Sequence, residues 1–403
     1  MPRLLFFLLS LLPLTMMAQE DSEEVVRRAG HIFSLIQHDQ ADSLYDMMAD
    51  DMRQVVTREH LRGVMLQVEQ MFGSFRELSQ WEVTRHDSLT VCSTICSFES
   101  GSLNLIVAFD DSWLLHGLRL MPVSENTSDE PLPDGVVELV DTVYAADGLA
   151  LPCVVTLSGL SAEPPIVVMV HGSGPLDRDE TVMTNKPFRD LAHLLALRGI
   201  SSLRYDKRTF VSSDPVASVE EETVNDALAA VALARTYNNN VYVLGHSLGA
   251  MMAPDIAAST VLQGIVMMAA PARDMEQVVG DQLDFLAASG ATEEQKRQAL
   301  SDLHRQAPHY FVPQHQVHKA LRLSIPMLLL QGERDYQVTM TDFRIWQKKL
   351  GKKKQVTLIS YPSLNHLFIS GEGPATPQEY LKKGIVSEQV ADDIAKFISP
   401  KNR

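Results

Sequence analysis

The chain of 403 residues has few cysteines and fewer basic than acidic side chains. Its three cysteines are too few for a framework of disulfides. There are 35 Lys and Arg against 51 Asp and Glu, and the formal net charge is −16. A nucleic-acid partner is therefore not expected, because binding a phosphate backbone requires a positive surface, and docking on anionic lipid heads is disfavoured. The 45% of hydrophobic and 21% of charged residues are typical of a globular protein with a packed core.

The N-terminus has the pattern of a secretory signal peptide. Arg3 precedes an apolar run, and Ala18 stands before an acidic stretch. Ser10 and Pro13 interrupt the run, which is too short to span a bilayer comfortably, although an uncleaved anchor is the alternative. No cysteine follows it to carry a lipid. We expect residues 1–18 to be cleaved and the mature protein to be periplasmic or secreted, with no membrane attachment.

Export would permit disulfides, so the positions of the cysteines matter. Cys92 and Cys96 lie in a segment typical of a strand. Four residues of a strand span about 13 Å, more than the Cα separation that a disulfide tolerates. Cys153 lies in another apolar segment. We expect three free, buried thiols, while a pairing of Cys153 with one of the other two stays open.

Residues 20–123 are predicted to form a small α+β domain. Segments 23–36 and 58–72 carry apolar residues at the three- and four-residue spacing of amphipathic helices. Helices followed by antiparallel strands are typical of this class, and the layout resembles the small domain found ahead of some secreted bacterial hydrolases. The expected strands, separated by turn residues, are 81–86, 89–98, 103–109 and 113–121.

The remainder of the chain has the pattern of an α/β domain. Residues 124–135, with acidic residues and two prolines, are predicted to be a linker. From residue 136 a leading hairpin precedes continuous apolar runs that alternate with helices. Such runs indicate a mostly parallel, doubly wound sheet covered on both faces. Within this domain, residues 136–403, a helical insertion at about 272–320 is expected to form a cap over the site.

The motif Gly245-His246-Ser247-Leu248-Gly249 lies between a predicted buried strand and a helix of small residues. A G-x-S-x-G in this context is a nucleophile elbow, in which side chains at the glycine positions would collide with backbone. The turn would lift the Ser247 hydroxyl above the sheet and direct the amides of the helix N-terminus toward a developing oxyanion. An ordinary glycine-rich turn is the alternative.

A serine nucleophile needs a base and an orienting acid, and in this architecture the acid and then the histidine follow it in the chain. Asp335 lies in a loop after a buried strand, and His366 is the one histidine after that loop. We therefore predict Ser247, Asp335 and His366 as the catalytic residues. Glu333 and Asp342 are nearby competitors, and Glu333 could replace Asp335 as the acid, although helix-start and surface roles suit both better.

The loop 171–175, His-Gly-Ser-Gly-Pro, follows another predicted strand. It is expected to present the backbone N–H of Ser173 as an oxyanion donor beside that of Leu248. Its two glycines could also indicate a dinucleotide-binding loop. Asp177 occupies the place of the third glycine of that motif, so phosphate binding is disfavoured.

With these elements in order, residues 136–403 resemble an α/β-hydrolase. The segments 171–181 (HGSGPLDRDET) and 203–208 (LRYDKR) are similar to those of secreted bacterial esterases of the serine-aminopeptidase-like branch. The resemblance implies hydrolysis of small-molecule carboxyl esters of small to medium acyl chains by the three predicted residues, without a metal or an organic cofactor. The chain departs from many relatives in carrying Thr209-Phe210, rather than glycine, after the second segment.

Side chains near these motifs have two interpretations each. Phe285, Tyr310 and Phe311 in the cap are predicted to line the substrate pocket, with packing of cap against core as the alternative. Charged residues at 177–180 and 206–208 are expected to support the oxyanion loop rather than to bind substrate. Solvated histidines are favoured over a metal site for the four imidazoles of the cap, His304, His309, His315 and His318.

Other functions stay open at this point. The same triad would serve a peptidase or an acyltransferase, because it does not distinguish an ester from an amide or water from another acceptor. A non-catalytic binding protein on a hydrolase scaffold is an alternative from another class. The first domain could serve substrate docking or dimerisation, which leaves a homodimer open.

Overall fold

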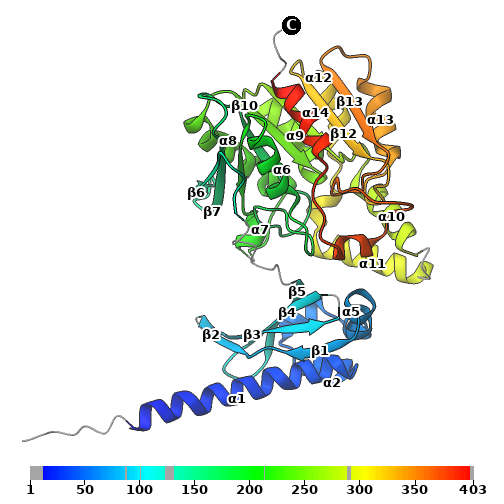
Figure 1. Cartoon of the computed structure of the whole chain (residues 1–403). Helices are drawn as coiled ribbons and strands as arrows, with labels where there is room; N and C mark the ends of the chain where they lie inside the picture. The colour runs from blue at the N-terminus through cyan, green and yellow to red at the C-terminus, as the bar shows by residue number, and fades with distance from the viewer. Residues whose placement is uncertain are drawn as a thin grey trace, which may run out of the picture. The chain divides into compact units, whose positions relative to one another are not determined.

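The computed structural model describes residues 12–86, 89–99, 101–122, 131–212, 214–287 and 292–399. The chain divides into two compact units, the first ending at Glu125 (Figure 1). Most of the predicted signal peptide and residues 124–130 of the predicted linker lie outside the described residues. No helix in the described part of the chain is both long and apolar enough to cross a membrane.

The first unit begins with helices. Helix α1, Leu12–Gln37, covers the predicted segment 23–36 and starts inside the residues predicted as a signal. The helix expected over 58–72 is divided at Gly63, whose φ of +69° is a left-handed conformation that interrupts a helix. The remaining helices are α2 (Ala41–Asp46), α3 (Asp50–Val55), α4 (Arg58–Leu61) and α5 (Val64–Phe72).

A five-stranded antiparallel sheet completes this unit, in the order β1-β3-β4-β5 with β2 also paired to β3. Cys92 and Cys96 are fully buried on one face of β3, and Leu105 and Val107 are buried on β4. The four expected strands are confirmed, and β1 is an addition that its short Phe-Arg-Glu-Leu sequence did not indicate. The strands are β1 (Phe75–Leu78), β2 (Glu82–His86), β3 (Leu89–Phe98), β4 (Gly101–Phe109) and β5 (Leu115–Pro122).

The second unit is built on an eight-stranded sheet of order β13-β12-β11-β10-β8-β9-β7-β6. The expected leading hairpin is confirmed as the antiparallel pair β6 and β7, and β7 is also antiparallel to β9. The other pairs are parallel, as the apolar runs predicted. The strands are β6 (Val136–Tyr144), β7 (Ala150–Ser158), β8 (Ile166–Val170), β9 (Ser201–Tyr205), β10 (Val241–His246), β11 (Gly264–Met268), β12 (Met327–Gly332) and β13 (Val356–Tyr361).

Helices bury both faces of this sheet. Val168 and Val170 of β8 belong to a core shared with α8 (Asp226–Tyr237), α9 (Leu248–Ser259) and α13 (Met340–Leu350). Val167 and Met169 of the same strand point to the opposite core, shared with α6 (Pro187–Ala196) and α14 (Glu388–Ile398). Because successive side chains of a strand alternate between faces, the apolar side chains of β8 are buried on both sides of the sheet.

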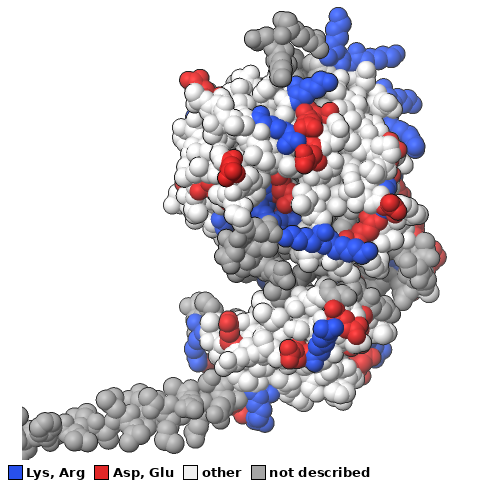
Figure 2. All heavy atoms as spheres, in the orientation of Figure 1, with Lys and Arg blue, Asp and Glu red and all other residues white. Residues whose placement is uncertain are grey.

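The expected cap segment lies between β11 and β12. It contains α10 (Met275–Ala287), α11 (Glu293–Gln306), the short 3-10 turn η3 (Pro308–Phe311) and α12 (Gln316–Arg322). On the face that Figure 2 shows, acidic and basic side chains are interspersed over a surface that is mostly neither.

Candidate active site

Ser247 lies on a strained turn between β10 and α9. Its φ of 52° and ψ of −115° lie in a region that residues other than glycine rarely adopt. A Cβ at Gly245 would lie 2.2 Å from the carbonyl oxygen of Gly249, and one at Gly249 would lie 2.1 Å from that of Val170. The steric reason predicted for the two glycines is therefore confirmed. Leu248 is the first residue of α9, so its N–H points out of the helix end.

Asp335 and His366 are brought together by the loops that follow the neighbouring strands β12 and β13. His366 Nδ1 lies 2.7 Å from Asp335 Oδ2, and both side chains are buried. The other carboxylate oxygen, Oδ1, accepts hydrogen bonds from the backbone N–H groups of Gln337 at 2.8 Å and Val338 at 3.0 Å. With the carboxylate ionised, Nδ1 carries the hydrogen and Nε2 is the basic nitrogen of the imidazole.

The loop after β8 presents one free N–H between two that are occupied. The N–H of Gly172 donates to Glu180 Oε1 at 2.8 Å, and that of Gly174 donates to the Tyr310 hydroxyl at 3.0 Å. Among the described residues, the N–H of Ser173 has no hydrogen-bond partner, and neither has that of Leu248. These are the two amides that the sequence predicts as oxyanion donors.

A cavity of about 450 Å³ opens over the elbow and the loop. Ser173 and Ser247 line it, and Tyr310 and Phe311 line it from η3. Most of its other walls are apolar and come from the cap and the ends of the strands. They include Pro271, Met275, Val278, Val279, Leu303 and Val338.

Phe285, predicted as a pocket residue, lies elsewhere. The face of α10 that lines the cavity carries Met275, Val278, Val279 and Gln282. Phe285 continues that stripe by about one turn, since residues three or four apart share a helix face. At that point it stacks on Tyr336, with 4.6 Å between ring centroids, and is 36% exposed. The helix extends past the end of the cavity, so its periodicity alone did not separate Phe285 from the lining residues.

Glu180 and His246 form a buried ion pair beside the elbow. His246 Nδ1 lies 3.0 Å from Glu180 Oε2, and its Nε2–H donates to the backbone carbonyl of His366 at 2.9 Å. Burial opposes a charge on His246, but the adjacent carboxylate outweighs burial and raises the pKa of His246. Burial also opposes the charge of Glu180, yet His246 lowers the pKa of Glu180. The ionised pair thus connects the oxyanion loop to the loop of His366.

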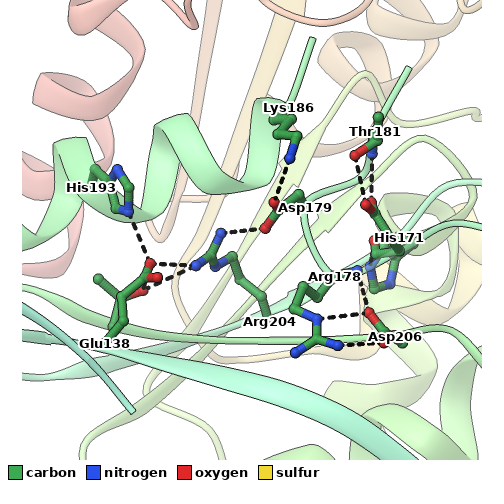
Figure 3. Close-up of polar contacts among 11 residues, drawn as sticks. Glu138, His171, Arg178, Asp179, Thr181, Lys186, His193, Arg204 and Asp206 are labelled. Carbon is green, nitrogen blue, oxygen red and sulfur yellow. Dashed lines mark hydrogen bonds and ion pairs between the residues drawn. The ribbon is translucent and has the colours of Figure 1, made fainter. Parts of the chain in front are cut away.

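Further charged pairs hold the segment after the oxyanion loop, as Figure 3 shows. Arg178 donates two side-chain hydrogen bonds to the carboxylate of Asp206, at 2.9 and 2.7 Å. The guanidinium of Arg204, only 1% exposed, lies between Asp179 and Glu138, at 2.6 and 2.5 Å. Within the predicted cluster, Arg178 thus pairs with Asp206, and Asp179 pairs with Arg204 outside it; support of the loop by this cluster stays a prediction.

His171, the first residue of the loop, is fully buried, and burial lowers the pKa of its side chain to about 4. Its Nε2 bonds the carbonyl of Asp177 at 3.0 Å. A neutral imidazole is therefore part of the loop's packing, with its ring edge-on to Tyr205 at 5.2 Å between centroids.

The four histidines of the cap do not share one place. His304 lies 2.6 Å from Glu276 and stacks on Phe311. His309 Nε2 lies 2.9 Å from Glu222 Oε2. His315 and His318 are exposed. His315 is the N-cap residue of α12, and His318 lies within that helix. In the described ranges no three His, Cys, Asp or Glu side chains are grouped as a metal site would require.

Glu222 lies close to the candidate site, although the sequence pattern does not single it out. It is fully buried in the π-helical segment η2 (Glu220–Asn225), where its carboxylate contacts Lys207, His309 and Tyr310. Single π-helical turns inside helices are frequent at functional sites. The three consecutive glutamates at 220–222 carry no signal that distinguishes the buried one from the other two.

The family described as "Alpha/beta hydrolase family" matches residues 167–375, just over half of the chain. The esterase EstD of Thermotoga maritima is 36% identical over 391 residues, which cover 91% of this chain and 94% of that protein. The chain belongs to the alpha/beta hydrolase family.

Two further comparisons describe the parts of this alpha/beta hydrolase. The solved structure of an esterase of Pyrococcus furiosus has a TM-score of 0.50 at 15% identity, covering 66% of this chain and 91% of that one, and so shares the fold. The family described as "Protein of unknown function (DUF3887)" matches residues 29–118, within the first unit. The resemblance inferred from the motifs is confirmed for the second unit.

Proposed function

We propose that this alpha/beta hydrolase is a serine carboxyl-ester hydrolase with Ser247 as nucleophile, His366 as base and Asp335 as orienting acid. The observation that carries the proposal is the 2.7 Å contact between His366 Nδ1 and Asp335. In support, Asp335 and His366 follow β12 and β13, Ser247 follows β10 of the same sheet, and Ser247 lines the cavity. Nucleophile, acid and base also follow one another along the chain in the order of this family's triad.

The reaction follows the acyl-transfer scheme. Ser247 Oγ attacks the ester carbonyl while His366 Nε2 takes its proton, and the carbonyl π electrons move onto oxygen. The N–H groups of Ser173 and Leu248 stabilise that oxyanion. Collapse expels the alcohol, protonated by His366, and leaves an acyl-enzyme that water hydrolyses by the same steps. Asp335 holds the tautomer and stabilises the imidazolium.

The cavity supports esters with small to medium acyl chains. Its walls are mostly apolar, and its volume of about 450 Å³ falls in the range of sites for small molecules. The relative EstD is named an esterase, which favours an ester over the amide that a peptidase would cleave. Acyl transfer to an acceptor other than water remains the second candidate within the same chemistry.

We also propose that the protein is exported to the periplasm or beyond the cell, with residues 1–18 removed. Arg3, the apolar run and Ala18 support this proposal. Mass spectrometry of the protein expressed with its own N-terminus tests it. A mature chain starting at Gln19 is expected, and a full-length chain retained in the cytoplasm would contradict it.

The function is tested by hydrolysis of p-nitrophenyl esters from acetate to decanoate, with Ser247→Ala as the matched variant. We expect the wild type to hydrolyse the series with an optimum at a short or medium chain, and the variant to lose the activity. A folded wild type that cleaves none of the esters, but cleaves peptide amides, would move the assignment to a peptidase.

A further inference from the structure

One chain of hydrogen bonds holds the oxyanion loop on both sides of Ser173. On one side, the Tyr310 hydroxyl accepts the N–H of Gly174 at 3.0 Å and donates to Glu222 Oε1 at 2.6 Å. Tyr310 belongs to η3 of the cap, and Glu222 belongs to the segment before α8. The cap is thereby bonded to the loop itself, not only packed near it.

On the other side of Ser173, Lys207 connects Glu222 back to the loop. Its Nζ lies 2.6 Å from Glu222 Oε1 and donates to the carbonyl oxygen of Gly172 at 2.6 Å. The contacts therefore run from Gly174 through three side chains back to Gly172, with the free N–H of Ser173 between the two ends. We call Tyr310, Glu222 and Lys207 the loop clamp.

Burying the charged side chains of the loop clamp costs desolvation free energy, which argues for a role beyond packing. The side chains of Lys207 and Glu222 are 2% and 0% exposed. Replacing a buried ion pair by apolar residues is often neutral or stabilising, so the burial of this pair is weak evidence for a role in stability and is compatible with a role in fixing the loop's geometry. His309 Nε2, at 2.9 Å from Glu222 Oε2, adds a second contact from the cap turn to the same carboxylate.

The conformation of the loop shows why such support is needed. Gly174 has a φ of +86°, in the left-handed region that glycine adopts without strain. A glycine in an otherwise open position can move among many conformations, because no side chain restricts it. Without the bond to Tyr310, the N–H of Gly174 would be released, and the direction of the Ser173 N–H would no longer be fixed.

We propose that the loop clamp is a positioning device that fixes the Ser173 N–H in the oxyanion hole and makes this hole depend on the seating of η3. The proposal rests on the proposed function, in which Ser173 is an oxyanion donor. Tyr310 also lines the cavity, so an ester bound there contacts the clamp. Tyr310, Glu222 and Lys207 act through the loop and take no part in bond making.

The test removes one hydroxyl with Tyr310→Phe. We expect kcat for a p-nitrophenyl ester to fall about 10- to 100-fold, since a displacement of about 1 Å at a catalytic group can cost a hundredfold, while KM changes less than about threefold. A trifluoromethyl ketone, to which Ser247 adds to give an anionic adduct in the oxyanion hole, should bind more weakly by the same factor. A purely structural role would not shift the inhibitor and kcat together.

Tyr237→Phe is the matched control. Tyr237 also donates its hydroxyl to a carboxylate, Asp141 at 2.7 Å, but lies at the end of α8 and outside the cavity. The Tyr237→Phe variant should keep the kcat, KM and inhibitor affinity of the wild type. Wild-type values in Tyr310→Phe, or a loss of kcat with unchanged inhibitor affinity, would overturn the proposal.

Hydrogen exchange of the peptide 171–176 provides a readout independent of turnover. In Tyr310→Phe, the amide of Gly174 should exchange at least about tenfold faster than in the wild type, because its acceptor is gone. Unchanged exchange would overturn the loop clamp. If the wild type neither cleaves esters nor binds the ketone, the proposed function fails, and the exchange result alone then decides the clamp.

Discussion

Replacing Asp335 by asparagine inverts the hydrogen bond on which His366 depends. Oδ1 of Asp335 accepts two backbone N–H groups, those of Gln337 and Val338. An asparagine has one carbonyl oxygen, and satisfying these two donors turns its NH₂ toward His366 Nδ1, 2.7 Å from the replaced oxygen. Because an NH₂ group cannot accept, His366 must move its hydrogen to Nε2, where it can no longer take the proton of Ser247.

The expected loss is about 10⁴-fold in kcat, which corresponds to about 5 kcal/mol of transition-state stabilisation. Steady-state kinetics with p-nitrophenyl butyrate measure it. Urea unfolding measures the stability of the variant. Its free energy of unfolding should fall by only about 1–3 kcal/mol, because the Nε2 donor of Gln331, 3.2 Å from Oδ2 in the wild type, would face the NH₂ donor of the asparagine. Glu333→Gln is the matched control. Glu333 is exposed, accepts the Ser360 hydroxyl at 2.7 Å, and should retain activity within about twofold. A folded Asp335→Asn that loses less than tenfold would refute the assignment of the acid.

Three further predictions concern the ion pair, the pocket and the thiols. The pKa of His246 is raised above its ordinary 6.5 and the pKa of Glu180 is lowered below its ordinary 4.5. Their pair therefore stabilises the fold most between pH 4.5 and 6.5, and the contribution of His246 is lost as the pH rises through its folded pKa. Glu180→Gln should therefore cost more at pH 6, about 3 kcal/mol, than at pH 9 in thermal unfolding, and equal costs would contradict the pair's role. Phe311→Ala should shift the acyl-chain optimum to longer esters, whereas Phe285→Ala should not, and a shift in both would contradict the cavity boundary. Burial raises the pKa of Cys92 and Cys96 to about 11 and that of Cys153 to about 12. A disulfide reagent at pH 8 should therefore label the thiols of the native protein at least about a hundredfold more slowly than those of the unfolded protein. Rapid labelling of the native protein would contradict the burial of these thiols.

The sequence predicts the main parts of the candidate site because the fold imposes their arrangement. In a parallel sheet, the loops that follow neighbouring strands emerge at the same edge. Asp335 after β12 and His366 after β13 therefore meet, although 31 residues separate them in the chain. The glycines of the elbow are equally predictable, because the turn leaves no space for a side chain at Gly245 or Gly249.

Contacts between the cap and the loop could not be predicted in this way. Glu220, Glu221 and Glu222 are identical in the sequence, and the structure buries only the third of them fully. Which glutamate is buried depends on the π-helical geometry of η2 and on the packing of η3 against it. No periodicity along the chain encodes the packing of η3 against η2, because Glu222 and Tyr310, which form a hydrogen bond there, are 88 residues apart.

Local conformation accounts for the remaining differences. The apolar spacing over 58–72 is that of one helix, but Gly63 adopts a left-handed conformation and divides it into α4 and α5. The spacing along α10 is also correct, yet the cavity ends before Phe285. Periodicity identifies the face of a helix that is buried, and the neighbouring segments decide how far along the helix that burial extends.

The central claim is that Ser247 is the nucleophile of an ester hydrolase, and covalent labelling tests it most directly. The wild type is treated with diethyl p-nitrophenyl phosphate and examined by intact-mass and peptide mass spectrometry. The account predicts one diethylphosphoryl group per chain, on the peptide that carries Ser247, with loss of esterase activity in proportion and no labelling of Ser247→Ala. Full activity in an unlabelled wild type, or stoichiometric labelling of another residue with loss of activity, would contradict it.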